Sequence, residues 1–242
     1  MKLLAATLRW FTDSAHWSGA DGIPYRLGEH LLITATAVLI ASVIAIPLGV
    51  LLGHRGRGGF LAINVSNIGR AIPTFAVLVL FAASPIGFGN RATVIALAIF
   101  ALPPVLTNTY VGMRGVDPDV RESAVGMGMT RAQLIRRVEL PLARPLVLTG
   151  LRTSTVQVVA TATLAAVVGG GGLGRFVVDG FGQQDQVMLL AGALLVAGLS
   201  LAVELAMGAV QRAVTPGRRT ALDRPGAAAL ATDRVAVAAP TV

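Results

Sequence analysis

The chain contains no cysteine, and only 13% of its 242 residues are charged. A soluble domain carries roughly 25% charged residues, so this low value argues for a membrane protein and against a large solvated domain. The absence of cysteine excludes disulfide bonds and thiolate-bound metals. The three histidines, His16, His30 and His54, share no metal-ligand spacing, so no metal site is predicted. No set of residues has the pattern of a catalytic site, and we expect the chain not to be an enzyme.

Acidic residues are few as well. The chain has 20 Lys and Arg against 12 Asp and Glu, and its sequence pI is about 11.4. Such a pI can indicate a nucleic-acid-binding protein. Here, however, the basic residues gather in the turn 54–59, in the segment 114–145 and in the tail from residue 212 onward. This is the positive-inside bias of membrane proteins. The predicted partner is therefore the lipid bilayer, and no nucleic acid is expected.

Long apolar runs make up most of the chain, which is 54% hydrophobic with a mean hydropathy of +0.72. As helices of about 20 residues, such runs can cross roughly 30 Å of hydrocarbon. We predict an all-α membrane protein with five transmembrane helices, or six if residues 1–28 also cross. The five runs are 31–53, 60–83, 92–113, 145–168 and 187–210.

These runs divide the chain into three parts. Residues 1–28 are predicted to form an interfacial segment. Residues 29–212 form the transmembrane domain. Residues 213–242, rich in Arg, Ala and Pro, are predicted to be a disordered tail. The charge bias places the segment 114–145 and the tail in the cytoplasm, and five spans then place the N-terminus outside.

The segment 114–145 is the longest charged stretch between the apolar runs, with arginines at 114, 121, 131, 136, 137 and 144. Asp117 followed by Pro118 predicts the start of a short helix. Gly126 and Gly128 should end this helix. Three residues should share one of its sides: Val120, Ala124 and Met127.

A second short helix is predicted after the two glycines. Thr130 and Gln133 have the spacing of a capping box, and Pro141 should end the helix that the box begins. The expected product is a helix, a glycine elbow and another helix. Such a compact unit on the cytoplasmic face is suited to docking into a cleft on a partner.

The same segment carries a longer spaced pattern. Residues 122–124 read E-S-A, Gly128 follows after three residues, and nine further residues precede V-E-L-P at 138–141. This resembles the EAA loop of ABC importer permeases, which reads E-A-A, three residues, G, nine residues, I-x-L-P. In that family the loop docks on the ATP-hydrolysing subunit and transmits its closure to the spans. The resemblance implies coupling roles for Glu122, Ser123, Ala124, Gly128, Val138, Leu140 and Pro141.

Four further stretches are EHLLITATAVLIASVIAIPLGVLLGH from residue 29, RAIPT at 70–74, NTYVGM at 108–113 and ATATLAAVVGGGGLG at 160–174. They resemble the permeases for osmoprotectants such as glycine betaine, choline, carnitine and proline betaine, over about residues 28–210. The resemblance implies a type I ABC importer transmembrane domain in the bacterial cytoplasmic membrane. The alternatives are a permease for methionine or another amino acid, which shares the same loop, and a secondary transporter that works alone.

Aromatic residues make up only 5% of the chain, with two Trp and two Tyr. An aromatic cage for a quaternary ammonium group needs several such faces, so this chain is not expected to build one. We place tight substrate recognition on a separate extracytoplasmic binding protein. The resemblance also implies ATPase subunits and a second, identical or homologous, permease. ATP and Mg would bind to the ATPase subunits, and this chain is expected to hold no cofactor.

Polar residues within the apolar runs suggest two further sites. Arg152 and Glu204 are predicted at similar depths, where they could form an ion pair that fixes helix packing without binding substrate. Uncharged polar residues could line a path for a zwitterion or quaternary cation, although some of them could instead bond neighbouring helices. The candidates for this path are Thr107, Asn108, Gln157, Thr161 and Thr163.

The glycine run 169–174 resembles a phosphate-binding loop only superficially. It lacks the Gly-Lys-Ser/Thr ending, and it follows the fourth span on the predicted outer side, where ATP is absent. We predict that it serves close helix packing or a hinge.

Overall fold

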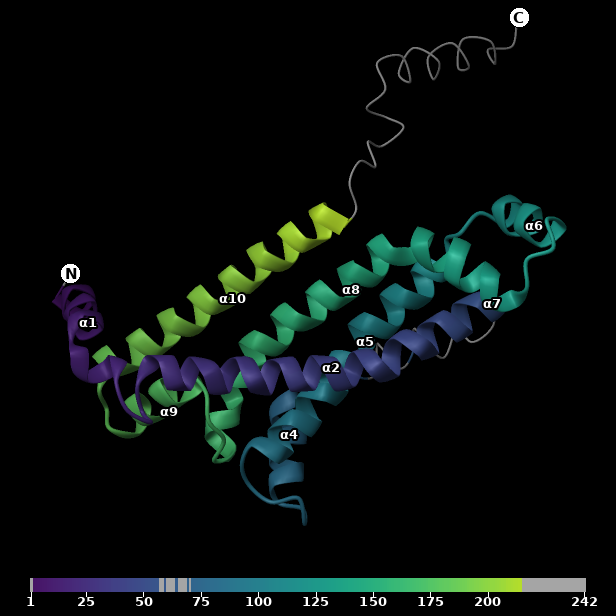
Figure 1. Cartoon of the computed structure of the whole chain (residues 1–242). Helices are drawn as coiled ribbons and strands as arrows, with labels where there is room; N and C mark the ends of the chain where they lie inside the picture. The colour runs from purple at the N-terminus through teal and green to yellow at the C-terminus, as the bar shows by residue number, and fades with distance from the viewer. Residues whose placement is uncertain (1, 57–58, 60–63, 65–68, 70, 215–242) are drawn as a thin grey trace, which may run out of the picture.

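The structure is a computed structural model, and it describes residues 2–56, 59, 64, 69 and 71–214. Long helices run beside one another along the molecule, and most of the short helices lie at its two ends (Figure 1). Within the described residues, four helices are long and apolar enough to cross a membrane: α2 (Ile23–Arg55), α5 (Asn90–Arg114), the continuous helix Arg131–Val168, and α10 (Gln186–Val214). The predicted all-α membrane architecture is confirmed.

The core forms where α5 packs against α2 and against α8 (Leu140–Thr161). Small residues allow the backbones of these helices to approach closely. A Cβ added to Gly49 of α2 would lie 2.7 Å from the Cβ of Thr109, and one added to Gly150 of α8 would lie 2.8 Å from the Cβ of Asn108. Alanines dominate the rest of this contact, including the fully buried Ala41 and Ala162. The close approach holds the three helices as one body.

The helix α2 begins eight residues before the predicted apolar run at 31. Gly22 is extended, and Pro24 occupies the first turn, where its missing N–H costs no hydrogen bond. With 33 residues, α2 is about 50 Å long at about 1.5 Å per residue, which exceeds a hydrocarbon core of about 30 Å. Its first turns therefore extend beyond the apolar part of the span and carry the polar residues Arg26, Glu29 and His30.

Parts of two predictions lie outside the described residues. The last part of the predicted span 60–83 is the helix α4 (Thr74–Ala82), which packs against α5, whereas most of residues 60–70 are not described. The predicted tail 213–242 lies outside the described residues from position 215 onward.

The helix that follows the charged loop differs most from expectation. Pro141 was predicted to end the second loop helix, and this is wrong: α7 (Arg131–Leu134), the π-helical turn η2 (Ile135–Glu139) and α8 run on without a break. The N–H of Leu140 bonds to the C=O of Ile135, five residues back. Pro141 follows directly after this π-helical turn, inside the continuous helix. The 3-10 segment η3 (Ala162–Val168) completes the helix.

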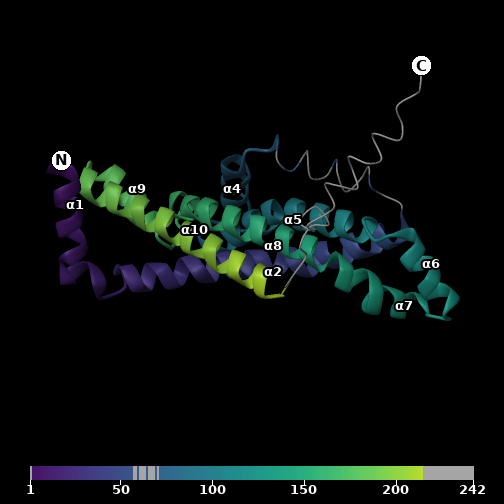
Figure 2. The ribbon, with the colours of Figure 1, turned by 90° about the horizontal axis from the view of Figure 1, so that it is seen from above.

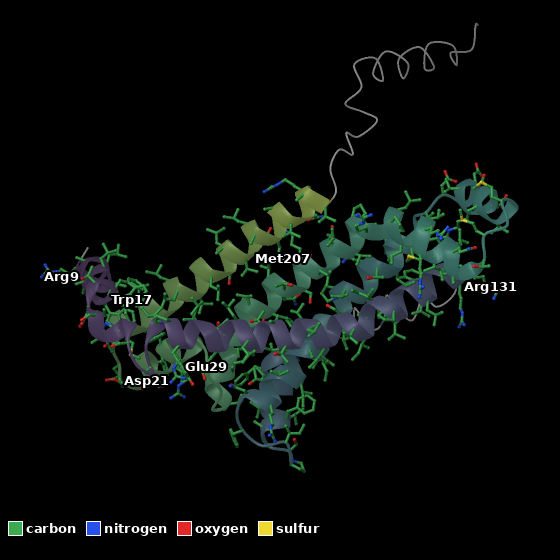
Figure 3. The ribbon with its side chains drawn as sticks, viewed as in Figure 1. Arg9, Trp17, Asp21, Glu29, Arg131 and Met207 are labelled. Atoms are coloured by element: carbon green, nitrogen blue, oxygen red, sulfur yellow. The ribbon has the colours of Figure 1, made fainter. Side chains whose placement is uncertain are left out.

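The two ends of the molecule carry different short helices. The helices α1 (Lys2–Thr12), η1 (Ser14–Trp17) and α9 (Gly174–Gly182) lie at one end, and α6 (Pro118–Gly126) lies with α7 at the other, as Figures 1 and 2 both show. Figure 3 likewise places Arg9 and Trp17 far from Arg131. We call these the α1–α9 end and the α6–α7 end. Phe176 of α9 is buried in a cluster that Trp10 of α1 also contacts, which fixes both helices there.

Candidate functional site

The helices α6 and α7 begin as their sequences predict. The side chain of Asp117 accepts a hydrogen bond from the N–H of Asp119 at 2.9 Å, which caps α6. The N–H of Thr130 donates to the side chain of Gln133 at 2.8 Å, and the N–H of Gln133 donates to the Thr130 hydroxyl at 3.4 Å. Both halves of the predicted capping box are therefore present. Residues 117–134 are referred to below as the α6–α7 unit.

The elbow between the two helices requires glycine at position 128. The N–H of Gly128 bonds to the C=O of Val125 at 2.9 Å, and the N–H of Met129 bonds to the C=O of Ala124 at 3.2 Å. This pair of bonds is a Schellman motif, which needs a left-handed residue after the helix. Gly128 has φ of +81°, a conformation that costs a residue with a side chain about 1–2 kcal/mol.

Apolar side chains of the α6–α7 unit face outward. Met127 is 73% exposed and Val125 is 56% exposed, on a unit that otherwise carries many charges. Of Val120, Ala124 and Met127, which were predicted to share one side, only Ala124 is buried, and Met127 lies just beyond the end of α6; the shared side stays a prediction. Exposed apolar groups with a polar rim are typical of a protein contact surface.

The predicted coupling residues divide between the surface and the interior. Glu122, Ser123, Gly128 and Pro141 are exposed, Ala124 is buried, and Val138 and Leu140 are half-buried. The sequence assigned no role to Glu139, which lies between Val138 and Leu140. Glu139 is fully buried and lies at the end of η2.

Glu139 connects the α6–α7 end to the core. One carboxylate oxygen, Oε2, lies 2.8 Å from Nδ1 of His54 at the end of α2. The other, Oε1, lies 3.2 Å from Nε of Arg121 on α6, without an aligned hydrogen bond. Arg121 also donates to the C=O of Met113 in the last turn of α5. The buried carboxylate of η2 thus contacts α2 and α6, and Arg121 in turn connects α6 to α5.

At the α1–α9 end, side chains hold the glycine turn 169–173. The N–H of Gly171 donates to Oδ1 of Asn90 at 2.8 Å, and the N–H of Gly172 donates to Oε2 of Glu29 at 3.0 Å. A Cβ on Gly171 would overlap the Glu29 carboxylate. Close packing, which the glycine run predicted, is therefore confirmed.

His30 completes this contact from α2. Its Nδ1 accepts from the N–H of Leu173 at 3.3 Å, and its Nε2 lies 2.9 Å from the C=O of Val159. Because a carbonyl oxygen only accepts, the ring proton must be on Nε2, and the two bonds together select the neutral tautomer. His30 therefore ties the glycine turn and the end of α8 to α2.

Residues 45–216 match the family described as binding-protein-dependent transport system inner membrane component. This match spans more than half of the chain. The chain belongs to this family. The carnitine transport permease protein OpuCB of Listeria monocytogenes is 40% identical over 211 residues, which cover 87% of this chain and 94% of the relative. The choline transport system permease protein OpuBB of Bacillus subtilis is 37% identical over 192 residues, which cover 79% and 88%.

A solved structure has the same fold as this inner membrane component. The inward-facing MetNI methionine ABC transporter aligns with a TM-score of 0.67 and 24% identity, covering 77% of this chain and 93% of that chain. The predicted type I ABC importer fold is confirmed. The predicted osmoprotectant permease family is also confirmed, since the two relatives above are carnitine and choline permeases.

In this inner membrane component, the five polar residues predicted to line a path are on two helices. Thr107 and Asn108 are on α5, whereas Gln157, Thr161 and the nearby Thr163 are on α8 and η3. Asn108 donates to the C=O of Pro104 at 2.8 Å, and the Thr161 hydroxyl donates to the C=O of Gln157 at 2.8 Å. The Thr163 hydroxyl bonds to the C=O of Ala160 at 2.9 Å.

Asn108, Thr161 and Thr163 thus donate to carbonyl oxygens three or four residues earlier in their own helices. A cavity of about 750 Å³ lies between α2 and α5 near Glu29, but none of the five residues lines it. Their role in a path stays a prediction.

The structure brings Arg152 of α8 and Glu204 of α10 together as an ion pair. Arg152 also donates to the side chain of Gln211 at 3.2 Å, and Gln211 donates to the Thr149 hydroxyl at 2.8 Å. The side chains of Arg152 and Glu204 are each about a third exposed. This polar network joins α8 to α10, and its predicted role in helix packing stays a prediction.

Sequence reasoning missed Glu139, Glu29 and His30. The signal for Glu139 in the sequence was weak. Glu139 is the one acidic residue between 131 and 145, and it stands at position x of the I-x-L-P pattern, where any residue is allowed. For Glu29 and His30 the signal was a Glu-His pair at the start of an apolar run. Neither signal names the distant partners: His54 is 85 residues from Glu139, and Gly172 and Leu173 are 143 residues from Glu29 and His30.

Proposed function

We propose that the chain is the permease subunit of an ATP-driven importer for osmoprotectants such as glycine betaine, choline, carnitine or proline betaine, and that an ATPase subunit docks on the α6–α7 unit. The observation that carries this proposal is the outward apolar surface at Met127 and Val125, on a unit fixed by two caps and a glycine elbow. The solute class is supported by relatives named as carnitine and choline permeases.

The proposed orientation follows from the docking site. The α6–α7 end faces the cytoplasm, where ATPase subunits are found, and the N-terminus lies outside. The α1–α9 end then faces the extracytoplasmic binding protein. A second, identical or homologous, permease completes the translocation path. ATP and Mg bind to the ATPase subunits, and this chain binds neither.

A single helix supplies a route between the two ends. The continuous helix Arg131–Val168 has 38 residues, which corresponds to about 57 Å at about 1.5 Å per residue. It begins in the α6–α7 unit and ends at the glycine turn that Glu29 and His30 hold. When the ATPase subunits close, displacement of the α6–α7 unit shifts this helix and changes the populations of inward-open and outward-open states.

Reconstitution tests the proposal. The chain would be co-expressed with its ATPase, partner permease and binding protein, purified, and placed in proteoliposomes. We expect the ATPase to co-purify and uptake of glycine betaine, choline or carnitine to require ATP and the binding protein. Uptake of methionine or another amino acid alone would contradict the solute class. Uptake by the chain without an ATPase would contradict the coupling and favour a secondary transporter.

A further inference from the structure

The buried carboxylate of Glu139 lies where the α6–α7 unit meets the membrane core. The helix α6 makes few contacts with the rest of the molecule. Ala124 is its one buried residue, and the helix packs mainly on α7 and η2. The Arg121–Glu139 ion pair is therefore a principal connection between the proposed docking helix and the rest of the molecule. A movement of α6 must act on this pair.

Stability alone is a weak reason for a buried ion pair. Its desolvation cost often exceeds the attraction between the charges, and a well-packed apolar group in the same place is frequently as stable or more stable. Glu139 carries this cost with a side chain that is 1% exposed. It also terminates η2, a π-helical turn, and turns of this kind inside longer helices occur frequently at functional sites.

The geometry of the cluster fits transmission of movement. Oε2 of Glu139 is held by His54 on α2, so the carboxylate is fixed relative to that helix. Oε1 faces Arg121 at 3.2 Å without an aligned hydrogen bond. Because this second contact is incompletely made, a small shift of α6 can strengthen or weaken it. The guanidinium of Arg121 also bonds to α5 through the C=O of Met113, so the same shift reaches three helices of the core.

We propose that Glu139 is a positioning residue for coupling: through Arg121 and His54 it passes the displacement of α6 to α2, α5 and α8. Glu139 touches neither solute nor ATP in this role. The inference rests on the proposed function, because it assumes that an ATPase moves the α6–α7 unit.

The test uses the whole reconstituted transporter and the Glu139→Gln variant, which keeps the volume of the side chain and removes its charge. Two ratios are measured: ATP hydrolysis with and without liganded binding protein, and solute imported per ATP hydrolysed. We expect the stimulation ratio to fall by about fivefold or more, the lower end of ordinary allosteric coupling, and solute per ATP to fall with it. A double variant with Arg121→Gln should be no worse than the more impaired single variant, because the two residues act as one pair.

The control is Glu204→Gln, which makes the same chemical change in a second ion pair, on α10 and away from the α6–α7 unit. It should keep the stimulation ratio of the unmodified transporter. If Glu139→Gln lowers only the melting temperature or yield and leaves both ratios intact, Glu139 is structural and the inference is wrong. If the unmodified chain neither binds an ATPase nor imports solute, the proposed function itself is wrong. The same preparation thus distinguishes this outcome from a failure of the inference about Glu139.

Discussion

The two ends of the molecule are both held by acidic residues, but in different ways. At the α1–α9 end, Glu29 accepts a hydrogen bond from the backbone of the glycine turn, and Asn90 and His30 add similar bonds. At the α6–α7 end, Glu139 is bound only by side chains, His54 and Arg121, from other helices. Bonds to the backbone fix one loop conformation. Ion pairs between side chains of separate helices can change as the helices move.

This difference predicts that the two ends of the molecule have different roles, one in stability and the other in coupling. The α1–α9 end is closely packed, and several of its glycines have no room for a side chain. The elbow of the α6–α7 unit is open, since a Cβ on Gly126 or Gly128 would meet nothing within 4 Å. Substitutions at the first end should therefore change stability, and substitutions at the second end should change coupling.

The largest effect is expected from Gly174→Ala at the α1–α9 end. The added Cβ would overlap the backbone C=O of Thr163, which cannot move as easily as a flexible side chain. The expected loss of stability is about 3 kcal/mol, at the upper end for overpacking, measured as a lower melting temperature of the purified complex. Gly182→Ala is the matched control: it lies in the same helix, with nothing within 4 Å, and should be neutral or slightly stabilising. Equal effects of both substitutions would contradict the close packing.

At the α6–α7 end, Gly128→Val should impair coupling more than overall stability. A β-branched residue strains the left-handed elbow by about 2 kcal/mol and disturbs the Schellman motif. We expect membrane insertion to persist and the stimulation of ATP hydrolysis by liganded binding protein to fall. The control is Gly126→Ala, two residues earlier, in a helical conformation with open space around it. Normal stimulation of ATP hydrolysis in the Gly128→Val variant would show that the elbow takes no part in coupling.

The substitution Thr130→Ala is expected to have a smaller effect at the same end. It removes half of the capping box at the start of α7, a loss of about 1 kcal/mol. Because α7 continues into α8, the first turn should fray while the span stays folded. Hydrogen exchange of residues 131–134 should become faster, with α10 as the internal reference. Unchanged exchange there would show that the cap does not hold the start of α7.

The smallest effect is expected from Glu204→Gln, between the two ends. In this variant the amide oxygen can still accept a hydrogen bond from Arg152, and Arg152 keeps its bond to Gln211, so most of the polar network survives. We expect a slightly lower melting temperature, with transport retained at an unchanged KM for solute. Loss of transport with full stability and assembly would instead assign the pair to substrate binding and overturn its predicted role in packing.

The sequence predicted what depends on neighbours in the chain. The caps at Asp117 and Thr130 and the elbow at Gly128 each involve residues a few positions apart in the chain. Their patterns can therefore be recognised from the sequence alone. The predicted runs 92–113 and 187–210 each lie within four residues of the ends of α5 and α10. These features needed no knowledge of the tertiary structure.

Contacts between distant segments were not predictable in the same way. The glycine turn was expected to pack closely, but its partners Glu29 and His30 are more than 140 residues away. Pro141 was taken as a helix end because proline usually breaks helices, but here the helix continues from the π-helical turn into α8. The helix α9, which follows the glycine run, was not predicted. Its residue Phe176 is buried by contacts with distant residues that include Trp10 and Ile23.

Cross-linking from single cysteines tests most directly whether the α6–α7 unit is the ATPase docking site. The chain has no cysteine of its own, so each introduced thiol is unique. Met127→Cys places a thiol on the exposed elbow, and Gln183→Cys places one on the exposed surface after α9 at the opposite end. In the purified transporter, we predict cross-links to the ATPase subunit from Met127→Cys and none from Gln183→Cys. An ATPase cross-link from Gln183→Cys, with none from Met127→Cys, would contradict the docking site and the orientation of the chain in the membrane.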